Sequence, residues 1–218
     1  MRIILFLKFL YRIIKYLLGS TKRYSFLLFS VFKTRPSSII EIGVYNGNRA
    51  IELIETAKIF NKKVEYYGFD LFEEFYETKN RIKKELSKLP LSKKDIQNKL
   101  NKLAKIHLLK GDTKKTLPKF IRQKKKVDFI FIDGGHSVNT IKSDWNAIKK
   151  IISKRSLVIF DDYYEIKKNI LNKYGCNNVI TSLSAKAYKS KKFIIGDTFF
   201  DKFLNIKKKI YMVSVKKL

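Results

Sequence analysis

The sequence predicts an α/β domain in which seven β-strands, most of them parallel, form one sheet with helices on both faces. Three observations lead to this prediction. The chain has 218 residues, 45% of them hydrophobic, which is enough for one domain with a substantial core. From residue 37 onward, short β-branched runs alternate with helical stretches, as in strands joined by crossover helices. The run VDFIFIDGG at 127–135 is almost continuously apolar, as a strand covered on both faces must be.

The N-terminal segment predicts an amphipathic helix over residues 1–20, followed by the α/β domain over residues 21–218. Its basic residues gather on one side: three fall within an arc of about 60° at 100° per residue, and a fourth lies about 80° further round. In that order they are Lys8, Arg12, Lys15 and Arg2. These charges argue against a membrane-spanning helix. The absence of a small-residue cleavage site argues against a signal peptide. Residues 1–18 are therefore expected either to contact a membrane surface peripherally or to pack on their own domain or a second subunit.

The remaining elements follow in order along the chain. Strands are expected at 37–45, 63–72, 105–112, 127–135 and 156–164, with two late strands at 177–183 and 209–217. Helices are expected at 48–60, across most of 73–105, at 117–124 and at 137–152. Residues 73–105 and the segment after Asp162 are expected to cover a bound acceptor, because insertions at strand ends commonly form lids.

A glycine turn follows the first strand in the run EIGVYNGN, where Gly43 and Gly47 form a G-x-x-x-G pattern. Glycines here let the backbone approach a ligand at the carboxyl edge of the sheet, where open α/β folds bind cofactors. The second strand ends in Asp70, which could accept hydrogen bonds from the hydroxyls of a ribose. The third ends in Gly111 and Asp112. Three consecutive strand ends thus carry glycine or aspartate at one edge.

These motifs resemble those of the class I S-adenosylmethionine-dependent methyltransferases over residues 37–165. The resemblance implies a Rossmann-like sheet whose last strand is antiparallel, and it implies S-adenosylmethionine as the cofactor. By that resemblance, Glu41 and the glycine turn hold the methionine part, Asp70 the ribose, and Asp112 the purine amine. The full implied cofactor set is Glu41, Gly43, Tyr45, Gly47, Asn48, Asp70, Leu71, Gly111, Asp112 and Asp133.

Three carboxylates are expected at the mouth of the sheet, because Asp133 ends the fourth strand and Asp161 and Asp162 end the fifth. Such oxygen ligands suit Mg²⁺, which could in turn hold a diol substrate. The stretch resembles the metal-dependent O-methyltransferases, of the catechol type and of the macrocin O-methyltransferase and methyltransferase domain 24 group. That resemblance implies O-methylation of a sugar, another hydroxylated small molecule or a glycan precursor. If residues 1–18 contact a membrane, a lipid-linked glycan precursor becomes the favoured acceptor.

His136 stands where the catechol type carries a catalytic lysine, three residues after Asp133. A neutral imidazole near pH 7 could take the proton from the acceptor hydroxyl, so His136 and Asp133 are the expected catalytic residues. Other roles stay open. Asp161 or Asp162 could cap a turn, and His136 could be a hydrogen-bond partner of Asp133 or a helix N-terminal residue without chemistry.

The net charge of +29 raises the alternative of an RNA methyltransferase. Only eight of the 48 basic residues are arginine, however, and the proline-rich motif common in base N-methylation is missing after the fourth strand, so no specific nucleic acid is expected. A cofactor-binding module without catalysis is the other alternative. The single cysteine, Cys176, indicates a reducing compartment and hence the cytoplasm. Assembly into a homo-oligomer is expected only by analogy.

Overall fold

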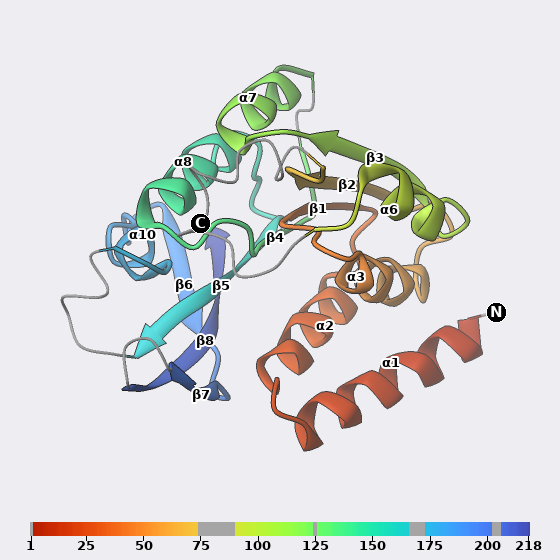
Figure 1. Cartoon of the computed structure of the whole chain (residues 1–218), viewed down its shortest axis with the longest axis horizontal. Helices are drawn as coiled ribbons and strands as arrows, with labels where there is room; N and C mark the ends of the chain where they lie inside the picture. The colour runs from red at the N-terminus through yellow and green to blue at the C-terminus, as the bar shows by residue number, and fades with distance from the viewer. Residues whose placement is uncertain (1, 74–89, 124–125, 166–172, 202–205) are drawn as a thin grey trace.

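The computed structural model describes residues 2–73, 90–123, 126–165, 173–201 and 206–218, and it shows one sheet with helices on both faces (Figure 1). The strand order is β3-β2-β1-β4-β5-β8-β6. The strand β7 also pairs with β8, along a different stretch from β6. The strands are β1 (Ser38–Ile42), β2 (Glu65–Asp70), β3 (Lys105–Lys110), β4 (Phe129–Ile132), β5 (Leu157–Glu165), β6 (Tyr188–Lys192), β7 (Asp197–Asp201) and β8 (Ile206–Lys217). The α/β class predicted from the sequence is confirmed.

The helices cover two separate hydrophobic cores, one on each face of the sheet. Helices α1 (Arg2–Leu18), α2 (Arg23–Thr34), α3 (Asn48–Lys58) and α6 (Lys93–Leu100) enclose the core on one face. Helices α7 (Thr113–Gln123), α8 (Val138–Ile148) and α10 (Asn177–Thr181) enclose the other. Alternate residues of each central strand therefore point into different cores, which explains why most residues of these strands are apolar.

The strands β3, β2, β1, β4 and β5 run parallel, and β8 runs antiparallel to β5. The expected antiparallel last strand is therefore confirmed. Within the described residues the sheet has eight strands, one more than expected, and the difference lies at the outer edge. β6 and β7 pair with consecutive stretches of β8, residues 213–217 and 206–210, so together they act as one interrupted edge strand.

One local prediction was wrong, and one helix was missed. Residues 177–183, expected as a strand, contain the short helix α10. Asn177 replaces strand pairing there: its side-chain amide accepts from the backbone N–H of Tyr164 and donates to that residue's carbonyl, both at 2.9 Å. The helix α2 was not expected at all. The predicted lid lies partly outside the described residues, at 74–89 and 166–172.

Helices α1 and α2 form a hairpin that packs on α3 (Figure 1). Leu5 and Phe9 of α1 enter the core on this face, and the Phe9 ring stacks on Phe32 of α2 with 4.6 Å between centroids. The described residues include no helix that is both long and apolar enough to cross a membrane. The N-terminal helix thus packs on its own domain through one face, and contact of its other face with a membrane or a second subunit stays a prediction.

Candidate functional site

The turn after β1 adopts a backbone conformation that requires glycine at both of its ends. Gly43 has φ +94°, and a Cβ on it would lie 2.1 Å from the carbonyl oxygen of Asp133. Gly47 has φ +74° and caps the N-terminus of α3, with its N–H donating to the Val44 carbonyl at 2.9 Å. Tyr45 between them is also left-handed, at φ 53°. The turn thus presents backbone rather than side chains at the carboxyl edge of the sheet.

Asp70 lies beside this turn because β1 and β2 are neighbours in register, with Ile42 opposite Phe69. Its carboxylate accepts hydrogen bonds from the backbone N–H groups of Tyr45 and Leu71, each at 2.7 Å. Burial raises the pKa of Asp70, and these backbone donors oppose the rise. The structure therefore brings Asp70, Tyr45 and Leu71 together, as the cofactor set predicted from the sequence requires.

Glu41 lies at the foot of the turn and has no exposed surface. The Tyr66 hydroxyl donates a hydrogen bond to its Oε2 atom. The other oxygen, Oε1, has no hydrogen-bond partner among the described residues. Burial raises the pKa of Glu41 to about 8, with Tyr66 opposing the rise. A buried acceptor left without a donor is costly, so this atom is suited to meet a donor from a ligand.

The other predicted cofactor residues lie around the same edge. Gly111 has φ +119° and donates its N–H to the Asp70 carbonyl at 2.9 Å, which joins the third strand end to the second. Asp112 is exposed, and its carboxylate accepts from the N–H of Lys114 at 2.9 Å at the start of α7. Asn48 is also exposed, and its side-chain oxygen accepts from the Lys99 ammonium at 2.6 Å. These two side chains have local structural partners.

Asp133 follows β4 and adjoins the glycine turn, since its N–H donates to the Ile42 carbonyl at 2.9 Å. Burial raises its pKa well above the ordinary value, and the nearby carboxylates of Asp161 and Asp162 raise it further. Asp133, Asp161 and Asp162 therefore lie near enough for their charges to influence one another, and the raised pKa of Asp133 favours its neutral form.

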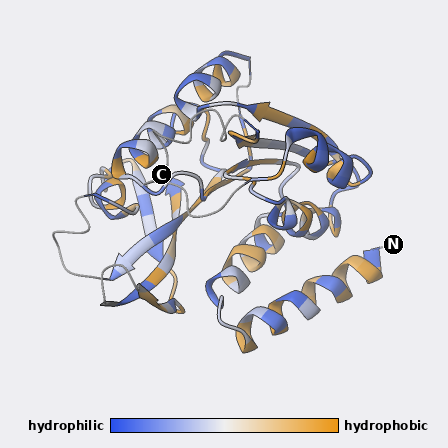
Figure 2. Cartoon of the chain, in the orientation of Figure 1, coloured by the Kyte–Doolittle hydropathy of each residue, from blue (hydrophilic) through white to orange (hydrophobic). Residues whose placement is uncertain are grey.

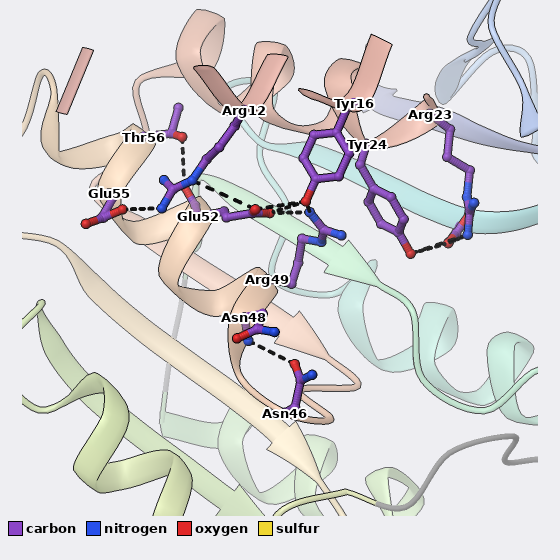
Figure 3. A network of polar contacts seen from close by, with 11 residues as sticks. Arg12, Tyr16, Arg23, Tyr24, Asn46, Asn48, Arg49, Glu52, Glu55 and Thr56 are labelled. Atoms are coloured by element: carbon purple, nitrogen blue, oxygen red, sulfur yellow. Dashed lines mark hydrogen bonds and ion pairs between the residues drawn. The ribbon is translucent and has the colours of Figure 1, made fainter. Parts of the chain in front are cut away.

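Asp161 is held by an arginine from the N-terminal hairpin. Arg23 donates from Nε and Nη2 to the two oxygens of Asp161, both at 2.8 Å, and from Nη1 to Asp197 at 2.6 Å. Both carboxylate side chains are 1% exposed. Burial lowers the pKa of Arg23, but Asp161 and then Asp197 raise it by more than burial lowers it. The guanidinium therefore stays charged. Figure 3 shows the side chains of Arg23 and Tyr24, both from α2, lying next to each other at this ion pair.

His136 pairs with Asp162 through its Nδ1 atom. The pairing follows from an irregularity in β5, where the register shifts between Phe160 and Tyr163 and Asp162 is left-handed at φ 61°. Asp162 raises the pKa of His136 to about 9, and burial opposes the rise. The imidazole is therefore mostly protonated at pH 7, so the expectation of a neutral imidazole at that pH was wrong. The cause is the Asp162 carboxylate, which stabilises the imidazolium.

The residues predicted to hold Mg²⁺ do not fit that ion in this arrangement. Arg23 donates hydrogen bonds to both oxygens of Asp161, and His136 pairs with Asp162. Two of the three predicted ligands therefore already have a cationic partner. Adding a divalent ion beside a buried guanidinium would bring like charges together. Among the described residues, no group of three or more His, Cys, Asp or Glu side chains is placed to hold a metal.

Sequence reasoning missed the contribution of the N-terminal hairpin to this site. Arg23 and Tyr24 reach the acidic cluster, and the Tyr24 hydroxyl lies 3.4 Å from Asp161. Arg49 of α3 lies over the Tyr24 ring at 3.6 Å and donates to the Tyr16 hydroxyl at 2.7 Å (Figure 3). One signal was available: the apolar run RYSFLLFSVF begins with an arginine in a chain that otherwise favours lysine.

Comparisons with known proteins identify the family and the fold of the chain. The sequence profile of a methyltransferase domain family matches residues 40–163, more than half of the chain. The O-methyltransferase TomG from Streptomyces achromogenes, solved with S-adenosylmethionine, is similar in fold, with a TM-score of 0.59, 12% identity, and 92% of this chain and 82% of that one covered. An O-methyltransferase from Bacillus cereus, solved with S-adenosylhomocysteine, has a TM-score of 0.59 at 12% identity, covering 88% of this chain and 79% of that one.

Two further similarities are less informative about the site. An rRNA methylase from Streptococcus thermophilus has a TM-score of 0.59 at 11% identity, covering 90% of this chain and 97% of that one. The uncharacterized protein R132 of Acanthamoeba polyphaga mimivirus is 30% identical over 71 residues, so the chain matches 32% of that relative's length. At these identities the solved structures establish the fold, and they do not identify the acceptor.

The sheet order and the solved structures similar to it give the chain the fold of the class I S-adenosylmethionine-dependent methyltransferases. Within that class, the chain belongs to the methyltransferase domain family whose profile it matches over residues 40–163.

Proposed function

We propose that this protein is an O-methyltransferase that acts on a sugar, another hydroxylated small molecule or a glycan precursor. One observation carries the proposal: the sheet edge that forms the cofactor turn also holds the His136–Asp162 pair and Asp133. A methyl donor bound at the turn would lie next to a proton-accepting group, because β4 pairs with both β1 and β5. Methylation of a hydroxyl requires both.

The residues of the turn fit S-adenosylmethionine, which supplies an electrophilic methyl group when bound. Gly43 leaves the turn without a side chain, so backbone groups are available to the methionine part. The unpartnered Oε1 of Glu41 is a buried acceptor suited to an ammonium donor. The Asp70 carboxylate is fixed by backbone N–H groups and is suited to a ribose diol.

His136 is proposed to receive the acceptor's proton. Asp162 holds Nδ1, which leaves Nε2 as the ring nitrogen for the acceptor and fixes the orientation of the ring. With a pKa of about 9, the neutral form of His136 becomes more abundant as the pH rises from 7 to 9. Methyl transfer should accelerate over that interval if His136 is the base. Asp162 is proposed to stabilise the charged imidazole, since it is the main cause of the raised pKa of His136, and Asp133 lies close enough to raise that pKa further.

The proposal does not need a divalent metal. In place of the Mg²⁺ suggested by the sequence, Arg23 supplies the positive charge that neutralises Asp161. Chelation therefore separates the two hypotheses: activity that is unchanged in EDTA supports the arginine, and activity restored only by Mg²⁺ supports the metal.

The decisive experiment is calorimetric titration with S-adenosylhomocysteine, followed by a radiolabelled methyl-transfer screen over sugars and diols. Gly43→Ala should abolish measurable binding, because its Cβ would overlap the Asp133 carbonyl. Ser190→Ala, on an exposed edge strand, is the matched control and should bind like the wild type. Binding by Gly43→Ala with wild-type affinity would overturn the placement of the cofactor.

RNA methylation remains the second candidate, supported by the charge of +29. Ribosomal RNA should therefore be included in the methyl-transfer screen. Labelling of RNA at physiological salt, with no labelled sugar or diol, would favour this candidate. Cofactor binding without transfer to any acceptor would favour a binding module.

A further inference from the structure

The helix α1 contacts the protein through Leu5 and Phe9 and through polar side chains, and it leaves a broad apolar face toward solvent. Lys8 donates to Glu55 of α3 at 2.7 Å, and Arg12 also pairs with Glu55. The Tyr16 hydroxyl contacts both oxygens of Glu52, at 2.8 and 2.9 Å (Figure 3). These contacts fix the rotation of the helix about its own axis. A usual amphipathic helix exposes a polar face opposite its buried apolar residues, whereas α1 also carries apolar side chains on the face that solvent reaches.

The outward face of α1 is a continuous apolar strip. Its side chains are between 38% and 84% exposed and fall within an arc of about 160° at 100° per residue. They are Ile3, Ile4, Phe6, Leu7, Leu10, Tyr11, Ile14, Leu17 and Leu18. Figure 2 shows hydrophobic residues along the length of this helix, at the periphery of the molecule. We call these residues the α1 strip.

The strip continues onto α2. The rings of Phe6 and Phe32 have centroids 6.0 Å apart, and Phe32 is 6.5 Å from Phe29, which is 54% exposed. Apolar residues scattered singly over a surface are normal, but a contiguous strip of this kind marks an interaction site. The ion pairs to α3 hold it outward, so it cannot reach the core by rotation of the helix.

We propose that the α1 strip inserts into the interfacial region of an anionic lipid bilayer, with the helix lying in the plane of the membrane. Exposed basic side chains border the strip: Lys15 and Lys8 lie about 20° and 40° beyond its edge at 100° per residue, and Lys8 is 50% exposed. In this geometry the apolar side chains enter the acyl boundary, and the lysines reach the headgroups.

Charge favours an anionic bilayer over a second copy of the chain. A copy would bring the same lysines, and the same net charge of +29, against themselves. An anionic surface instead attracts every basic group near it. Phe6 and Tyr11 add aromatic rings, which are suited to the region between headgroups and hydrocarbon.

The test is flotation of the full chain with vesicles of phosphatidylcholine alone or with about 30% phosphatidylglycerol. Wild type should float with the anionic vesicles and bind the neutral ones at least about tenfold more weakly. The double variant Leu7→Ser, Ile14→Ser should lose about tenfold or more in affinity for anionic vesicles. Ile194→Ser, which changes an 84% exposed residue at the β6–β7 turn, is the matched control and should float like the wild type.

The variants replace exposed residues, so S-adenosylhomocysteine binding measured in parallel should stay unchanged and report on folding. This separates the membrane proposal from the proposed function, because either can fail without the other. Equal flotation of wild type and the Leu7→Ser, Ile14→Ser variant would overturn the proposal. So would a wild-type chain that stays off both vesicles and forms a dimer in ultracentrifugation that the same variant disrupts, since a second copy would then cover the strip.

Discussion

The cofactor half of the carboxyl edge, from β1 to β3, is fixed mainly by backbone groups, whereas the acidic half, at β4 and β5, is fixed by side chains from distant elements. In the first half, N–H groups of Tyr45 and Leu71 hold Asp70, and Gly43 leaves the room that the turn needs. In the second half, Arg23 holds Asp161 across 138 residues of sequence, and His136 holds Asp162. A site fixed by backbone depends on local sequence, and a site fixed by charges depends on partners that must all be present.

The largest expected effect comes from removing the cation of the acidic half. Arg23→Met would leave Asp161 and Asp197 buried without their guanidinium, so the free energy of unfolding should fall by about 3–5 kcal/mol. Urea denaturation followed by circular dichroism measures this change. Arg155→Met, at an exposed position, is the control and should stay within about 0.5 kcal/mol of wild type.

A second substitution tests whether the loss of stability comes from the unpaired charge of Asp161. Because Asp161→Asn removes a charge that Arg23 neutralises, the double variant Arg23→Met, Asp161→Asn should be more stable than Arg23→Met alone. If Arg23→Met were as stable as wild type, the acidic half would not depend on its long-range ion pairs, and the contrast between the halves would be lost.

A smaller effect is expected at Glu41, the buried acid of the cofactor half. Its folded-state pKa of about 8 lies above the ordinary 4.5, so the folded protein keeps a proton that the unfolded chain releases. The free energy of unfolding should therefore fall as the pH rises from about 4.5 to 8, and level off above that. Glu41→Gln keeps an acceptor for the Tyr66 hydroxyl and cannot ionise.

Between pH 6 and 8 the variant should gain about 2 kcal/mol relative to wild type, at roughly 1 kcal/mol per pH unit. Urea titrations at both pH values measure the difference. Glu55→Gln is the contrasting variant, because its ion pairs with Lys8 and Arg12 lower the pKa of Glu55 instead. Parallel stability curves for wild type and Glu41→Gln would show that Glu41 is ionised in the folded protein throughout this range.

The same contrast explains what the sequence could predict. The cofactor half was predictable because parallel strands bring their carboxyl ends to one edge, so Gly43, Asp70 and Gly111 could be placed together from spacing alone. Periodicity likewise predicted that α1 is amphipathic. It could not show that Lys8 and Tyr16 contact α3 while a broad apolar face stays exposed, because that depends on Glu52 and Glu55 of α3.

The acidic half resisted prediction for a similar reason. Strand ends placed Asp133, Asp161 and Asp162 at one edge, and oxygen ligands in a cluster then suggested Mg²⁺. The partner that changes the chemistry is Arg23, which lies on a helix that no motif marked. Only tertiary packing shows that this cluster already contains a cation.

The smallest effect is expected where a side chain touches the cofactor turn from outside. Lys99 of α6 donates to the Asn46 carbonyl at 2.9 Å and to the Asn48 side chain at 2.6 Å, in an exposed position. Exposed contacts of this kind contribute little, so Lys99→Ala should cost less than about 1 kcal/mol in stability and weaken S-adenosylhomocysteine binding less than about threefold. Lys94→Ala, exposed on the same helix, is the control. A tenfold loss of affinity in Lys99→Ala alone would mean that a side chain, rather than backbone, holds the turn, and the cofactor half would then resemble the acidic half.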